Sequence, residues 1–495
     1  MHDSIERLRK ELPHLEIDVG RETREAWRRD ASGFEGAPCG AVVSPRNAQE
    51  VEQLLRSARK IGLPLVPVGS RAPHHRGDTL CVDGSLVVDM RHFDRVVRID
   101  RRNRVALFEA GVTFESLTRE LAREGLRPLL PLGVRRGKSA LAAYLEREPT
   151  IYPRFQWDAS DPLLCTEVFF GTGERFRTGS AAGPGTLEEL WAAGDAQTNP
   201  MGPGQSDLMR VVQGAQGTIG IVTWCSARCV PIPEREHLFH VSGEHLTPLV
   251  EVAYGLLRRS HADILLFLDR NALAALEGKD RCDFLGRAGA GARWHLLFSV
   301  SEPRYFPEEK MRYVKREIAE LLDANGLCID EAAGNPALLA RLTQPDRDDP
   351  YWRYAGKDGV RELFFVSTLD RVERFLPIVA RAAGEAGIPP EGVLTYLQPL
   401  VGGRMCHVEF DFPFSLDDRE EWRRLDAMLW ALARDLKRAG AFFSRPYHRL
   451  SEIAFEGASS AWLVPKIKKL FDPDGLLSPG CLTLPAEDEG RRPEC

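Results

Sequence analysis

The chain has 495 residues, of which 43% are hydrophobic and 28% charged, and its formal net charge at pH 7 is −6. This composition is typical of a globular protein with two or three domains and enough length for a sizeable core. A negative net charge predicts no basic surface for nucleic acid or anionic lipid. No apolar run is long enough to predict a membrane span.

The N-terminus and the cysteines bear on cellular location. The first 18 residues are charged and lack the apolar region of a secretory signal, so we expect a cytoplasmic protein. The ten cysteines are scattered, and the close pair Cys225 and Cys229 has no second pair or histidine cluster beside it. We therefore expect neither a disulfide nor a metal site.

The first half of the chain alternates strand and helix patterns. An apolar run at 41–45 precedes a helical pattern over 46–62, in which Asn47 and Glu50 are placed as an N-cap and its partner. Further strands are predicted at 64–68, 85–90, 95–100 and 104–111, and a helix at 113–126. This alternation favours an α/β or α+β domain over a helical bundle or a β-sandwich.

The second half begins after the proline-rich stretch CVPIPERE at 229–236, which predicts the exit from the first domain. Alternating apolar residues predict strands at 295–301, 362–369 and 405–412. Helical spacing predicts helices at 307–326, 417–440 and 459–471. The charged tail after Pro485 is expected to be loose.

Several stretches, in their order and spacing, resemble the vanillyl-alcohol oxidase/p-cresol methylhydroxylase family of flavoproteins. They are AVVSPRNAQEVEQLLRSARKIGLPLVPV, SLVVDMRHFDRVVRID with ALFEAGVTFESL, AQGTIGIVTWCSARCVPIP and FDPDGLLSPG. Four more resemble the branch that acts on para-substituted phenols: DPYWRYAGKDG, LFFVS, GGRMCHVEFDF and LEREPTIYPRFQWDASDPLLCTEVFFGTGERFRTG.

The resemblance covers nearly the whole chain and implies an α+β fold of the PCMH type, named after p-cresol methylhydroxylase. It implies a two-part FAD-binding domain at 1–234 and a substrate or cap domain at 235–450, with a large antiparallel sheet and flanking helices. Residues 451–495 are expected to return to the FAD-binding domain. The implied cofactor is FAD.

The implied reaction transfers a hydride from a benzylic or alcohol carbon of a 4-alkylphenol-like substrate to flavin N5. By resemblance, Arg445 holds the phenolate; otherwise it is a surface arginine in a salt bridge. The family tyrosine beside it is Ser444 here. Asp158 matches an acidic residue near N5, or else forms an Asx turn ahead of Pro162.

Three further residues are candidates for the substrate pocket. Tyr152 shares a turn with Arg154. His407 alternates with the apolar set of its strand, and a satisfied core histidine is the other interpretation. His75 corresponds approximately to a second family tyrosine, and the alternative is a solvated loop histidine.

Two segments are matched to the cofactor. Backbone groups of QGAQGTIGIV are implied to contact the adenine and riboflavin, through Gly214, Gly217, Gly220, Ile221 and Val222. The loop VGSRAPHHRGD is implied to wrap the pyrophosphate, through Val68, Gly69, Ser70, Arg71, His74 and His75.

The pyrophosphate loop lacks glycines that the family carries. Ser70, His74 and Arg76 stand where glycine is expected, and Ala142 and Ala143 replace a Gly and an Asn in RRGKSALAAYLERE. Each added Cβ at a position with positive φ costs about 1–2 kcal/mol. Against this cost, Arg71, His74, His75 and Arg76 are expected to bring positive charge that favours an anionic diphosphate. Neither His nor Tyr, the family's attachment residues, directly precedes LFFVS.

The sequence leaves two main hypotheses and a weaker third. The first is an FAD-dependent oxidoreductase, and the second is a flavin-free member that serves as a structural or regulatory subunit beside an active paralogue. The 2-hydroxyacid dehydrogenase branch ranks last, because its His-x-x-Gly-Asp-Gly motif is missing. Expected partners are a small aromatic substrate and a second copy, a paralogue or an electron-transfer subunit. Oxygen, a cytochrome and a quinone remain open as acceptors.

Overall fold

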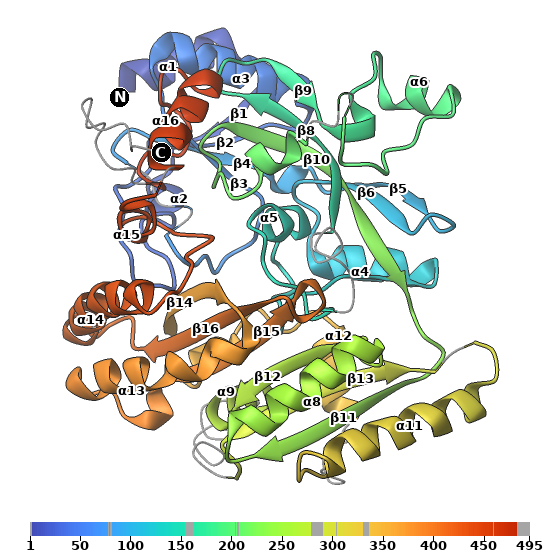
Figure 1. The fold of residues 1–495 in the computed structure, drawn as a ribbon. Coiled ribbons are helices and arrows are strands. Elements are labelled where there is room, and N and C mark those ends of the chain that lie inside the picture. Colours follow the sequence, from blue (N-terminus) through green and yellow to red (C-terminus); the bar gives the residue numbers. More distant parts are fainter. Residues whose placement is uncertain are drawn as a thin grey trace.

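Three sheets and the helices around them make up the protein. The computed structural model describes residues 2–482 apart from positions 78, 80–81, 154–161, 203, 205–206, 279–290, 303, 330–335 and 459. Figure 1 shows two of the sheets in one half of the molecule and the third in the other half, with β10 (Gly220–Pro231) leading toward the third sheet. The elements are helices and mostly antiparallel sheets, so the fold is α+β as expected.

The first sheet has the order β1-β2-β4-β3. Its strands are β1 (Glu16–Asp18), β2 (Ala41–Ser44), β3 (Leu65–Val68) and β4 (Leu86–Asp89). β4 pairs in parallel with both β2 and β3, which requires crossover connections. The first crossover is helix α3 (Ala48–Ile61), and Asn47 accepts the backbone N–H of Glu50 at its start, as predicted.

The second sheet has the order β5-β6-β10-β8-β9, with β7 also paired to β10. Its strands other than β10 are β5 (Val96–Asp100), β6 (Val105–Glu109), β7 (Leu126–Pro128), β8 (Leu163–Phe170) and β9 (Arg175–Arg177). Residues from both of these sheets, including Val43, Val88, Phe108 and Ile221, share one hydrophobic core. The first residues of β10 therefore lie close to the first sheet.

The third sheet has the order β11-β13-β12-β15-β16-β14, and all its pairings are antiparallel. Its strands are β11 (Glu236–Gly243), β12 (Leu265–Asp269), β13 (Trp294–Ser301), β14 (Gly359–Ser367), β15 (Leu394–Leu400) and β16 (Met405–Phe414). In β16, Val408, Phe410 and Phe412 face the helix-covered core, whereas His407 points to the opposite face, as the alternation predicted.

Most helices lie around the sheets, whereas α5 (Ala140–Leu145) lies between the two halves of the molecule (Figure 1). Besides α3 and α5, the helices are α1 (His2–Glu11), α2 (Arg21–Glu25), α4 (Phe114–Arg123), α6 (Leu187–Ala192), α7 (Met209–Val212), α8 (Leu246–Arg259), α9 (Arg270–Glu277), α11 (Pro307–Asp323), α12 (Pro336–Thr343), α13 (Leu376–Glu385), α14 (Arg419–Arg438), α15 (Leu450–Phe455) and α16 (Ser460–Phe471).

The C-terminal segment returns to the first sheet, where Leu477 bridges Leu65. Lys468 of α16 fixes this return, because its Nζ donates to the backbone oxygens of Thr218 and Leu477. Among the described residues, no helix is both long and apolar enough to cross a membrane.

Candidate functional site

A deep cavity lies where the first two sheets meet the third. Its empty space, including the open solvent at its mouth, is about 1310 Å³. Its walls come from the β3–β4 connection, the stretch from Val134 to Glu148, the start of β10 and three residues farther along the chain, Tyr351, Glu362 and Tyr447. The cavity therefore connects the half of the molecule with parallel strands to the antiparallel sheet, and such clefts commonly hold ligands.

The β3–β4 connection is held in place by the N-terminal segment. Ala31 N–H donates to the His74 oxygen over 2.8 Å, Arg76 N–H to Ser32 Oγ over 2.7 Å, and Gly77 N–H to an Asp30 carboxylate oxygen over 2.5 Å. These bonds fix a loop that would otherwise have few internal contacts. Burial raises the pKa of Asp30 to about 7, although the hydrogen bonds from Gly77 and Ser32 oppose this shift.

Glycine is required at Gly69, where the loop leaves β3. A Cβ at this position would lie 2.6 Å from the backbone oxygen of Ala110, which is too close for any side chain. Gly217, on the opposite wall, has φ +70°, and a Cβ there would lie 2.8 Å from Ser478 Oγ. Both glycines let separate segments approach and shape the cavity.

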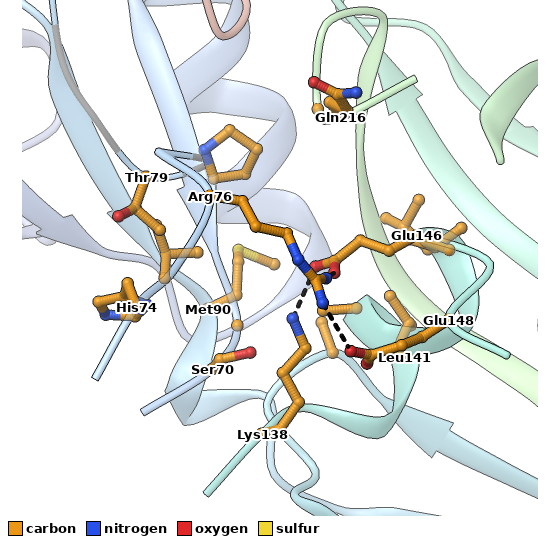
Figure 2. Close-up of a pocket in the computed structure, with 18 of the residues that line it drawn as sticks. Ser70, His74, Arg76, Thr79, Met90, Lys138, Leu141, Glu146, Glu148 and Gln216 are labelled. Atoms are coloured by element: carbon orange, nitrogen blue, oxygen red, sulfur yellow. Dashed lines mark hydrogen bonds and ion pairs between the residues drawn. The ribbon is translucent and has the colours of Figure 1, made fainter. Parts of the chain in front are cut away.

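The two histidines of the loop are held by other aromatic side chains. His74 points away from the charged residues of the cavity in Figure 2, and its ring stacks on Trp27 at 5.0 Å. His75 shares a hydrogen bond of 3.1 Å between its Nε2 and the Tyr354 hydroxyl. Burial lowers the pKa of His74 to about 3 and that of His75 well below its ordinary value, so both imidazoles are neutral at pH 7.

The positive charge expected from these histidines is therefore supplied by other residues. Arg135 and Lys138 line the cavity from the stretch before α5, and both side chains are largely buried. Arg76 is the third cation of the wall. The sequence prediction that His74 and His75 carry positive charge was wrong, because burial removes it.

Arg76 is the centre of an ion-pair network at one end of the cavity. Its guanidinium lies 2.5 Å from Glu362 and 3.2 Å from both Glu146 and Glu148. Lys138 Nζ lies 2.7 Å from the second oxygen of Glu146. Figure 2 shows the side chains of Arg76, Lys138, Glu146 and Glu148 converging. Arg76 thus links the loop to α5's C-terminal side and, through Glu362, to β14.

Behind Glu362 lies a second buried ion-pair layer. Arg353 Nε is 2.6 Å from Glu409, 3.3 Å from Asp411 and 3.6 Å from Glu362. The three carboxylates are close enough together to resemble a metal site, but the Arg353 guanidinium lies among them. Burial and the neighbouring Glu409 charge raise the pKa of Asp411, which favours its protonated form.

Arg445 lies next to this network. It is 94% buried, its Cζ is 4.3 Å from the centre of the Phe364 ring, and its Nη1 donates to the backbone oxygen of Glu146 over 3.3 Å. Its Nη2 has no hydrogen-bond partner among the described residues. A buried guanidinium nitrogen without an acceptor is costly, and an oxygen of a ligand bound beside it would supply that acceptor.

Comparisons with known proteins agree with this architecture. A family model described as FAD binding domain matches residues 39–138. The structure of p-cresol methylhydroxylase with bound substrate superposes with a TM-score of 0.78 at 16% identity, covering 97% of this chain and 96% of that one. A 4-ethylphenol oxidase from Gulosibacter chungangensis gives 0.79 at 17% identity, covering 98% and 97%. The chain thus contains a match to the FAD binding domain at residues 39–138 and has the PCMH-type fold over nearly its whole length.

The curated relatives of this chain are distant. The glycolate oxidase subunit GlcD of Bacillus subtilis is 25% identical over 240 residues, 48% of this chain and 47% of that protein. A probable mitochondrial D-lactate dehydrogenase of Danio rerio is 28% identical over 44% of this chain and 40% of its own length. The chain thus matches less than half of these relatives. An uncharacterized FAD-linked oxidoreductase of Mycobacterium tuberculosis is 24% identical over 89% of this chain and 90% of its own.

The residues of the cavity fit FAD. In the described part of the chain, the backbone N–H groups of Ser70, His74 and His75 have no protein acceptor, so they are available to an anion. The cations Arg135 and Lys138 add charge complementary to a diphosphate. Apolar side chains suited to flat rings make up much of the remaining wall, among them Val68, Met90, Leu141, Leu145, Val212, Ile219, Ile221 and Val222.

The structure places the sequence-predicted cofactor residues in two groups. Those that line the cavity are Val68, Gly69, Ser70, His74, His75, Gly217, Gly220, Ile221 and Val222. Arg71, which is exposed, and Gly214 are not part of the lining. Gly214 has φ +72° and open space around its Cα, so it serves the turn after α7.

The four predicted catalytic residues do not form one cluster. Arg445 and His407 are buried beside the ion-pair network, where His407 Nε2 lies 2.7 Å from Glu409. Tyr152 is buried elsewhere, with the Arg127 guanidinium 5.5 Å from its ring centre. Asp158 and Arg154 lie outside the described residues.

Sequence reasoning missed the carboxylates of the network. Glu362, Glu409 and Asp411 occupy strand positions whose neighbours are aromatic, in ELFF and EFDF. Charged residues at alternate positions of an otherwise apolar strand indicate that one face of the sheet is polar and buried. The sequence of β16 carries this pattern. Glu146 and Glu148 gave no comparable signal, because they lie in the polar stretch EREP after a short helix, and such a stretch is typical of an exposed loop.

Proposed function

We propose that this protein is an FAD-dependent oxidoreductase whose substrate binds at the Arg76 end of the cavity. The observation that supports this most directly is the buried Arg445, whose Nη2 lacks an acceptor beside residues that line the cavity. Bound FAD would supply a hydride acceptor, its N5 atom. The chain's own residues would bind the cofactor, orient the substrate and exclude water.

The cofactor would be held by the loop and by β10. Ser70, His74 and His75 would donate their backbone N–H groups to the diphosphate, and Arg135 with Lys138 would neutralise it. The start of β10, from Gly220, would contact the cofactor through its backbone. Because Arg76 contributes its charge to three carboxylates, we assign it to the substrate end rather than to the diphosphate.

Arg445 would anchor the substrate through an oxyanion. A guanidinium that is always charged stabilises a phenolate or alkoxide as electron density moves from the reacting carbon. The preferred substrates are therefore 4-alkylphenol-like compounds or other alcohols with an anionic oxygen a few bonds from the oxidised carbon. His407 would act as a positioning residue, since Glu409 holds its imidazole next to Arg353.

The test is anaerobic reduction of the FAD-loaded protein by a panel of 4-alkylphenols and hydroxylated acids. A substrate that bleaches the flavin band is expected, and Arg445→Met should raise its KM or lower its rate of reduction by about 100-fold, since a charge-assisted hydrogen bond contributes about 1.5–3 kcal/mol. Flavin content should not change, because Arg445 is outside the cofactor wall. Equal kinetics in both proteins would contradict the assignment of Arg445.

A flavin-free structural or regulatory role is the second candidate. The observation in its favour is Arg76, which joins the loop to Glu362 of β14 across one end of the cavity. If the protein binds no flavin when mixed with excess FAD while its fold is intact, this role replaces the first. Turnover of any substrate by the loaded protein alone would exclude it.

A further inference from the structure

Helix α16 presents apolar side chains to solvent. Among its described residues none is buried, and Trp462, Leu463 and Leu470 are 49%, 43% and 69% exposed. Its inner side is attached to the protein, since the Phe471 ring stacks on Phe170 at 4.2 Å and Lys468 Nζ lies 2.8 Å from Asp472. The helix is therefore fixed in place with part of its apolar surface uncovered.

After Ser460, its first residue, the exposed residues of α16 share one side of the helix. Counted from position 462, the other exposed positions follow after one, four, seven and eight residues, at 463, 466, 469 and 470. This spacing places all five on the same side of an α-helix. We name these residues, Trp462, Leu463, Lys466, Lys469 and Leu470, the outer face of α16. In Figure 1 the helix lies at the edge of the molecule beside α1 and far from α11.

The outer face is also positively charged. α16 contains no acidic residue, and Lys466 and Lys469 have no ion-pair partner in the part of the chain that is described. Lys466 Nζ lies 4.9 Å from the centre of the Trp462 ring, so its ammonium group lies against the indole and the two side chains form one cationic and aromatic surface. This local surface departs from the overall net charge of −6, which predicted no basic surface.

Two properties argue against a second copy of this chain as the occupant. In a twofold contact the same face appears on both sides, so the lysines of each copy would find no acidic residue on the other. A stable protein–protein interface buries about 800 Å² per partner, and three half-exposed apolar side chains on one short helix supply far less. A surface rich in negative charge with an apolar layer beneath it would pair with both the lysines and the exposed apolar side chains of this face.

We propose that the outer face of α16 binds the surface of an anionic lipid bilayer. Trp462, Leu463 and Leu470 would enter the boundary between headgroups and acyl chains, and Lys466 and Lys469 would contact the anionic headgroups. The helix would lie on the membrane and not cross it. The binding is reversible, because a few apolar side chains with two lysines give only a marginal anchor.

Co-sedimentation of the full-length protein with vesicles tests this proposal. The vesicles are made of phosphatidylcholine alone or of phosphatidylcholine mixed with phosphatidylglycerol. We expect sedimentation with the mixed vesicles only, and a decrease when salt is raised. Lys466→Gln and Lys469→Gln should each lower the partition about fivefold, which corresponds to about 1 kcal/mol per lysine. Leu470→Ser should lower it by a similar factor.

Matched controls come from α11, at the far end of the molecule. Phe306 is 71% exposed, close to the value for Leu470, and Lys310 is an exposed lysine. Phe306→Ser and Lys310→Gln should leave the partition unchanged. Leu470→Ser removes only an exposed side chain, so unchanged thermal unfolding is expected and separates lost binding from lost fold.

Three results would overturn the proposal. One is no sedimentation with either vesicle type, and another is sedimentation that the α16 variants do not alter. The third is a dimer, detected by light scattering without vesicles, that Leu470→Ser dissociates, since it would assign the face to a second copy. Flavin binding and turnover are measured separately, so failure here leaves the proposed oxidoreductase activity untouched.

Discussion

Replacing Arg76 with Met gives the most informative perturbation of the network. The change keeps most of the side chain's volume but removes the charge that faces Glu146, Glu148 and Glu362, whose side chains are 13%, 12% and 2% exposed. Removing one partner of a buried ion pair costs about 3–5 kcal/mol, because the remaining charge stays desolvated. We expect the free energy of unfolding at pH 7 to fall by that amount.

The pKa of Glu148 supports this magnitude. Burial raises it, but the charges of Arg76, Lys138 and Arg445 outweigh burial and lower it from 4.5 to about 2. A shift of that size corresponds to about 3 kcal/mol between the two protonation states. Because the folded-state pKa is lowered, this stabilisation is present above pH 4.5 and is lost as the pH falls toward 2.

Urea unfolding of both proteins from neutral to acidic pH measures the effect. The difference in unfolding free energy between the wild type and Arg76→Met should be largest near neutral pH. It should narrow as the pH falls below 4.5, because the wild type then loses the stabilisation that comes from ionised Glu148. Arg71→Met, an exposed arginine of the same loop, should change stability by less than about 0.5 kcal/mol. A loss below about 1 kcal/mol for Arg76→Met would refute the proposed energetics.

Two further predictions concern the cavity wall and the loop. Gly217→Ala adds a Cβ at φ +70°, 2.8 Å from Ser478 Oγ, so FAD affinity measured by fluorescence titration should fall about tenfold; an unchanged Kd would show that this wall does not contact the cofactor. Asp30→Asn removes a carboxyl whose pKa is raised to about 7, and a raised carboxyl pKa makes the folded state lose stability as pH rises from 3.8 to about 7. The unfolding free energy of the variant should therefore gain on that of the wild type as the pH rises from about 3.8 to about 7, and parallel pH profiles for both proteins would contradict this.

The order of strands and helices could be predicted from the sequence because it depends on local patterns. Apolar alternation located β13, β14 and β16, and helical spacing located α3, α4, α11 and α14. The N-cap of α3 followed from two residues three positions apart. Family resemblance then connected these elements into a known fold, including the return of the chain after α16.

The wall of the cavity could not be predicted in the same way, since its contacts join distant parts of the chain. Arg76 and Glu362 are separated by 286 positions, and Arg445 reaches an oxygen 299 positions away. The orientation of His74 depends on Trp27, which belongs to the N-terminal segment. A motif shows which residues occupy a loop. Whether its imidazoles are neutral, and how they are oriented, depends on the residues that pack around them.

The absence of the expected glycines has a structural explanation. The loop keeps Gly69, where a Cβ would meet the Ala110 oxygen. Its backbone N–H groups at His74 and His75 are positioned while Trp27 and Tyr354 hold the two imidazoles. Arg76 itself adopts φ +66°, a conformation that costs a non-glycine residue about 1–2 kcal/mol. Three buried carboxylates offset that cost by holding its guanidinium.

The central claim is tested most directly by titrating the purified, flavin-depleted chain with FAD. The visible absorption is followed during the titration, and the ratio of flavin to protein is measured after gel filtration. Binding in this cavity predicts one FAD per chain and a perturbed flavin band. It also predicts weaker binding when Lys138 is replaced by Met, because the diphosphate then loses a cation. A folded protein that retains no FAD from an excess, or that binds it equally well without Lys138, would contradict the account.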